Sequence, residues 1–103
     1  APGQLPSHYA PRTPLILLEI GAEPPELPGR VGLLSVFPVT HTRGFTKVEI
    51  LSPSLDLPEA ARNLFGALRR LDRLELDTIV ARPAPSIGLG LAINDRLHRA
   101  SQR

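Results

Sequence analysis

The stretch Asp56-Leu-Pro-Glu-Ala-Ala-Arg-Asn-Leu-Phe-Gly-Ala-Leu-Arg-Arg-Leu-Asp-Arg-Leu74 decides the fold, because it predicts one long amphipathic helix. Asp56 and Glu59 have the three-residue spacing of a capping box, and Pro58 is tolerated in the first turn of a helix. From Ala60 onward, apolar residues recur at intervals of three and four, which is typical of a helix that buries one face. The sequence therefore predicts a helix over about 56–74 with its apolar side on a core.

Short apolar stretches on both sides of this helix predict the strands of a sheet. Residues 14–20 and 31–36 are too continuously apolar to be half-exposed, and residues 77–81 predict another buried strand. Residues 46–51 alternate between charged and apolar side chains, which is typical of an exposed or edge strand. A terminal helix is expected after Gly88 and Gly90. Buried strands interleaved with helices predict an α/β domain with a mostly parallel sheet.

The beginning of the chain is organised by prolines. Four prolines in the first 14 residues favour an extended backbone, so residues 1–13 predict a Pro-rich linker and residues 14–103 the domain. Within this linker, Ser7-His8-Tyr9-Ala10-Pro11 places two polar rings between prolines. On a segment that cannot form a core, such rings are suited to contacting a ligand or another domain.

The composition excludes several kinds of catalytic and metal-binding site. The chain has 103 residues, enough for one domain, and it has no cysteine, which excludes disulfides, thiolate metal sites and cysteine nucleophiles. None of the three histidines has a second ligand at metal spacing, and no pair of carboxylates stands out as an acid/base couple. We expect no catalytic residue, no metal and no membrane span in the chain. Because it also lacks methionine, we expect it to be part of a longer protein.

The glycine-containing start of the terminal helix leaves two interpretations open. Gly88-Leu89-Gly90 follows a buried strand and opens a helix, which is where α/β folds bind phosphate on backbone amides. Gly88, Gly90, Asn94 and Asp95 are therefore a possible anion or nucleotide loop. The third glycine of the dinucleotide fingerprint is missing, however, so plain helix initiation is the alternative.

A row of arginines on the long helix is similarly ambiguous. Arg62, Arg69 and Arg73 fall on one outer stripe, opposite the leucines, and are possible RNA-facing residues. Because the net charge is only +2 and the chain has four aromatic residues, a solvated helix face is the alternative interpretation.

Several segments together resemble the two-domain threonylcarbamoyl-AMP synthases of the Sua-five type. The residues His8-Tyr9-Ala10-Pro11 and Pro14-Leu15 are similar to the interdomain linker of that family. The segments Ala60–Phe65, Leu68–Asp72 and Gly88–Leu97 resemble the hallmark helix and the C-terminal motif of its accessory domain. The resemblance spans most of the chain and is weakest over residues 22–45.

The resemblance implies a cytoplasmic parent enzyme that condenses L-threonine, bicarbonate and ATP into threonylcarbamoyl-AMP for tRNA modification. In the family, threonine and ATP, expected with a divalent cation, bind in an N-terminal YrdC-like catalytic domain, which no segment of this chain resembles. The chain would then be a Rossmann-like, three-layer accessory domain whose partners are that domain and, more distantly, tRNA-pathway proteins.

For the linker, the resemblance implies a gate that crosses the catalytic mouth, carried by His8, Tyr9 and Pro11. Many relatives have Lys-Tyr where this chain has Leu5-Pro6, so any contact of that lysine is absent or supplied otherwise.

Overall fold

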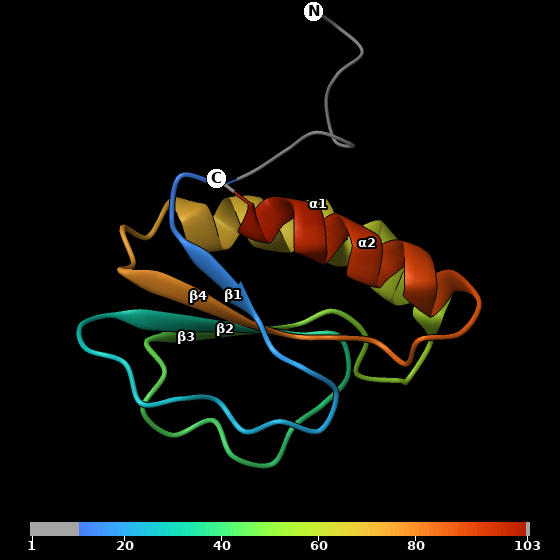
Figure 1. The fold of residues 1–103 in the computed structure, drawn as a ribbon, viewed down its shortest axis with the longest axis horizontal. Coiled ribbons are helices and arrows are strands. Elements are labelled where there is room, and N and C mark those ends of the chain that lie inside the picture. Colours follow the sequence, from blue (N-terminus) through green and yellow to red (C-terminus); the bar gives the residue numbers. More distant parts are fainter. Residues whose placement is uncertain (1–10, 103) are drawn as a thin grey trace, which may run out of the picture.

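The computed structural model describes residues 11–102, which form a four-stranded sheet and two helices. The strands are β1 (Leu15–Leu17), β2 (Val31–Ser35), β3 (Lys47–Ile50) and β4 (Thr78–Arg82), and the helices are α1 (Leu57–Asp72) and α2 (Leu89–Ser101). Neighbouring strands in the order β1-β4-β2-β3 are all parallel (Figure 1). The α/β class and the parallel sheet that the sequence predicts are therefore confirmed.

Both helices pack on the same face of the sheet, as Figure 1 shows. Side chains alternate along a strand, and Leu34, Ile79 and Ala81 belong to the buried cluster that joins the sheet to the helices. The helical side of this cluster consists of Ala60, Leu64, Ala67, Leu68, Leu71, Ile93, Leu97 and Ala100. The apolar stripe predicted for the long helix is thus the surface that covers the sheet.

The opposite face of the sheet is covered by loops. Val31, Leu33 and Val80 form a second buried cluster, and apolar side chains from the β1–β2 and β2–β3 connections pack against it. Four prolines between residues 22 and 45 prevent these connections from forming regular helices. Among residues 11–102, the sheet is therefore covered by helices on one face and by loops on the other (Figure 1).

The burial predicted for the first strand and the end predicted for the long helix both differ from the structure. The prediction that residues 14–20 form a fully buried strand is wrong, because β1 lies at the edge of the sheet and Ile16 is 38% exposed. The chain leaves the sheet after Leu18 and turns at Gly21, where φ is +83°. The long helix ends at Asp72 rather than near Leu74, which is 37% exposed.

The start of α1 uses an extended version of the predicted capping box. Asp56 accepts a hydrogen bond from the backbone N–H of Glu59 at 2.9 Å, as the spacing predicts. The N–H of Asp56 does not reach Glu59, because it donates to the hydroxyl of Ser52 at 2.7 Å, which in turn donates to the Glu59 carboxylate at 2.6 Å. Hydrogen bonds from Ser52 and then Ser54 lower the pKa of Glu59.

Candidate functional site

The carboxylate of Asp72, at the end of α1, binds the segment through which the chain enters the domain. Its Oδ1 accepts hydrogen bonds from the N–H of Thr13 at 2.9 Å and from the Thr13 hydroxyl at 2.8 Å, and its Oδ2 accepts from the N–H of Arg12 at 3.2 Å. Pro11 and Thr13 are buried. The end of the predicted linker is therefore fixed to the body of the domain, and we call Pro11–Thr13 with Asp72 the anchor.

The other two residues predicted for the gate, His8 and Tyr9, lie outside the described residues. Pro11 is the member of that prediction that the structure describes, and it belongs to the anchor. The gate itself stays a prediction.

The four residues of the predicted anion loop have structural partners. The amide of Asn94 donates to the carbonyl of Ala84 and accepts from its N–H, both at 2.8 Å, so both ends of the side chain are occupied. Gly90 is buried, and a Cβ there would overlap the carbonyl oxygen of Pro85. Gly88 is the exposed N-cap of α2 with φ of +53°. These contacts join β4 to α2 without needing a ligand.

Asp95, the fourth residue of that prediction, is exposed and pairs with Arg99 at 3.2 Å, one turn further along α2. Gly88, Gly90 and Asp95 line neither of the two best-formed pockets of the described residues, whereas Asn94 lines the second of them, together with residues of β1. Anion binding at this loop stays a prediction, since no observation tests it.

The arginines of α1 divide into two groups. Arg62, Arg69 and Arg73 are exposed, and within residues 11–102 their guanidinium groups make no hydrogen bond or ion pair. Arg70 instead forms a bidentate pair with Glu49 of β3, with both N···O distances at 2.9 Å. The predicted stripe therefore exists as a surface feature, while Arg70 ties the helix to the edge strand.

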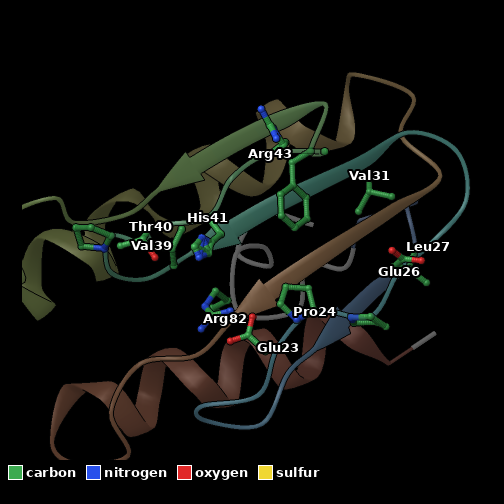
Figure 2. A pocket seen from close by; sticks show the side chains of 14 residues that line it. Glu23, Pro24, Glu26, Leu27, Val31, Val39, Thr40, His41, Arg43 and Arg82 are labelled. Carbon is green, nitrogen blue, oxygen red and sulfur yellow. The ribbon is translucent and has the colours of Figure 1, made fainter.

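A pocket of about 740 Å³ lies on the face of the sheet that the loops cover (Figure 2). Its walls come from residues 23–27, which follow β1, from residues 38–41 and 43–45, which follow β2, and from Val31 and Arg82 of the sheet. Sequence reasoning missed this pocket, because its walls belong to irregular segments. The available signal was Arg82, the charged residue that directly follows the buried stretch 79–81.

The described residues offer neither a metal-binding cluster nor a membrane-spanning helix. No cluster of three or more His, Asp or Glu side chains among residues 11–102 could hold a metal ion. In the same residues, no helix is long and apolar enough to cross a membrane.

Comparison with known proteins identifies similar sequences over nearly the whole chain. Residues 1–102 match the family model described as threonylcarbamoyl-AMP synthase, C-terminal domain. The threonylcarbamoyl-AMP synthase of Pyrococcus abyssi (strain GE5 / Orsay) is 33% identical over 113 residues, and that of Bacillus subtilis (strain 168) is 31% identical over 109 residues. Each comparison covers 98% of this chain and 32% of the relative, so the chain spans about a third of the length of these curated relatives.

Solved structures of the same family are also similar to this chain. The crystal structure of P. abyssi Sua5 complexed with L-threonine superposes with a TM-score of 0.70 at 31% identity, covering 98% of this chain and 32% of that one. A P. abyssi Sua5 variant, in which a histidine and the following tyrosine are replaced by alanine, has a TM-score of 0.58 at 37% identity. It covers 71% of this chain and 21% of that one.

Proposed function

Since the chain belongs to the family of threonylcarbamoyl-AMP synthase C-terminal domains, we propose that it is the accessory and gating module of such an enzyme. The parent condenses L-threonine, bicarbonate and ATP into threonylcarbamoyl-AMP and pyrophosphate in the cytoplasm, and the product serves the threonylcarbamoyladenosine modification of tRNA. ATP binds, with a divalent cation, in an N-terminal YrdC-like domain that is the partner of this module. The module supplies no catalytic group of its own.

The anchor is the observation that carries this proposal. Three hydrogen bonds from Arg12 and Thr13 to Asp72 fix the position at which the linker leaves the domain. An extended chain spans at most about 3.4 Å per residue, so His8 lies within about 17 Å of Thr13 whatever its conformation. A gate that is tethered in this way can act only within that distance of the folded body. The domain therefore acts as the support from which the linker closes the catalytic mouth.

The chemistry of the product explains why a gate is useful. Threonylcarbamoyl-AMP is an activated carbamoyl adenylate, which water hydrolyses. Closing the site over bound reactants excludes water and holds the reacting groups in order.

His8 and Tyr9 are the linker residues that we propose to contact the reactants. Tyr9 is the only tyrosine in the chain, so the sequence contains a single His-Tyr pair. The P. abyssi Sua5 variant carries alanine at a histidine and the following tyrosine, and we propose that His8-Tyr9 is the equivalent pair here. Both rings can donate and accept hydrogen bonds, which suits contact with polar substrates.

The test uses the full-length parent with His8→Ala and Tyr9→Ala together. We expect threonylcarbamoyl-AMP formation to fall by about 10- to 100-fold, because misplaced reactants and admitted water both slow the productive step. ATP binding to the catalytic domain should be unchanged. The matched control is His98→Ala, which removes an exposed histidine of α2. Unchanged kinetics in the double variant would remove the linker pair from the mechanism, and product formation by the 103-residue chain alone would refute an accessory role.

A second candidate function is contact with tRNA through Arg62, Arg69 and Arg73. Their shared exposure along α1 and at its C-cap, without a salt bridge among residues 11–102, is the observation that favours it. Reversing all three charges to glutamate should weaken RNA binding and reduce its dependence on salt concentration. Absence of binding at low salt by the unmodified protein would dispose of this candidate.

A further inference from the structure

Arg82 is a charged side chain that forms no salt bridge within residues 11–102. It ends β4, whose preceding residues Ile79, Val80 and Ala81 are fully buried, and it is itself partly buried. Its guanidinium group donates one long hydrogen bond, from Nη1 to the carbonyl of Ala22 at 3.4 Å. Among residues 11–102, no carboxylate lies within 4.0 Å of it. A guanidinium group has five N–H donors, so most of its bonding capacity is unused by the described protein atoms.

Arg82 also lies where parallel sheets bind ligands. It is in register with Ser35, the last residue of β2, so the carboxyl ends of two central strands meet beside it. From β4 the chain continues to α2 on the helical face, whereas from β2 it continues to the loops of the other face. Neighbouring strands whose connections leave in opposite directions open a crevice at their carboxyl ends, and ligands bind in such crevices.

The pocket next to Arg82 has the size and lining of a small-molecule site. Its volume of about 740 Å³ is within the range of ligand pockets. Leu27, Val31, Val39 and Phe45 contribute apolar walls. Figure 2 shows Arg82, His41 and Glu23 toward one end of the pocket, and Val31, Leu27 and Glu26 toward the other. The pocket therefore has a polar end that contains a cation, and an apolar wall at the other end with one carboxylate beside it.

We propose that this pocket binds a small organic carboxylate, with the carboxylate on Arg82 and an apolar body on the wall formed by Val31 and Leu27. A guanidinium group can donate two parallel hydrogen bonds to a carboxylate. Glu23 and Glu26 also line the pocket, and their charges disfavour a doubly charged phosphate more than a singly charged carboxylate. This ligand site goes beyond gating, since it would give the domain a binding partner of its own.

The experiment compares isovalerate with isovaleramide, two probes of nearly the same shape that differ in charge. Backbone amide shifts of the 103-residue chain are followed by NMR during titration with each probe. We expect isovalerate to bind with a dissociation constant of about 1–10 mM, as is usual for so small a ligand. The shifts should gather in residues 23–27 and 38–45. Isovaleramide should bind at least about tenfold more weakly, because it lacks the charge-assisted pair.

Two variants assign the effect to Arg82. Arg82→Gln should weaken isovalerate binding by about tenfold or more, whereas Arg82→Lys should retain part of it, since the charge stays but the paired geometry is lost. The matched control is Arg99→Gln, which removes an exposed arginine on α2. An unchanged amide spectrum outside the pocket verifies that each variant folds.

Several results would overturn the proposal. Equal binding of isovalerate and isovaleramide would exclude recognition of the charge. Undiminished binding by Arg82→Gln would exclude this arginine. Tighter binding of inorganic phosphate than of isovalerate would contradict the assignment to a carboxylate, and the absence of saturable shifts with any probe would exclude the site.

Discussion

Replacing Asp72 with alanine should release the entering segment from the domain without unfolding the rest. The substitution removes the acceptor of three hydrogen bonds, two of which involve Thr13, a residue that is only 7% exposed. A hydrogen bond to a charged group contributes about 1.5–3 kcal/mol, and buried donors left unpaired cost a comparable amount. The hydrogen bond from the exposed N–H of Arg12 contributes little to this free energy, because water can replace the carboxylate as its acceptor. Local opening at Thr13 should thus become about 3 kcal/mol easier.

Hydrogen exchange of the Thr13 amide measures this opening directly. A change of about 3 kcal/mol corresponds to roughly a 100-fold loss of protection. The amide of Val80, in the centre of the sheet, should keep its protection, since local and global opening are separate events. Asp72→Asn is the matched control, because it retains one oxygen acceptor and should lose only about 1 kcal/mol. If Asp72→Ala leaves Thr13 protected to within about threefold, the anchor does not hold the segment.

Four further predictions concern the body of the domain. Gly66→Ala should raise the free energy of unfolding by less than about 1 kcal/mol in a urea titration, since the gain in helix propensity is partly offset by the approach of the new Cβ to 3.3 Å from Nη1 of Arg70, whose guanidinium group is paired with Glu49. Gly90→Ala should destabilise strongly, since its Cβ would overlap a backbone carbonyl. Asn94→Ala should cost about 2–4 kcal/mol in the same assay, because the buried N–H and C=O of Ala84 lose their partners. The pKa of Glu59 is lowered by hydrogen bonds from two serine hydroxyls, so its stabilising effect is present above the ordinary value of 4.5 and is lost as pH falls through the lowered one. Glu59→Gln should therefore flatten the acid limb of a profile of stability against pH, and an unaltered limb would contradict this.

The sequence predicted α1 well because its signals are local. The N-cap at Asp56 and the apolar stripe depend on residues three or four positions apart, and both are present in the structure. The partner of Glu59 could not be predicted in the same way. Ser52 lies before the expected capping box, and the hydroxyl enters the cap only because the chain turns back between β3 and α1.

Features that depend on distant pairings could not be predicted. Nothing local to Leu15–Leu17 shows that β1 lies at an edge, since that depends on β4 joining it from 60 or more residues away. The role of Asp72 could not be predicted either. In the sequence it is an ordinary surface charge of a helix, and its partner Thr13 comes from the segment that precedes β1. Arg82 is a charged residue that follows an apolar stretch of the sequence, but its significance depends on loops whose positions the sequence does not specify.

The parallel sheet places the anchor and the Arg82 pocket at opposite ends of the domain. Thr13 precedes β1 and Asp72 leads into β4, so the anchor lies at the amino ends of the strands, whereas Arg82 lies at the carboxyl end of β4. A five-residue strand separates its two ends by about 17 Å of rigid, buried sheet. Coupling between the sites would require an element with two arrangements, and no packed strand offers one. We therefore expect Asp72→Ala to leave isovalerate binding unchanged, and isovalerate to leave the exchange of the Thr13 amide unchanged. A change in either measurement would mean that the two ends communicate, and that a ligand at Arg82 can alter the support of the gate.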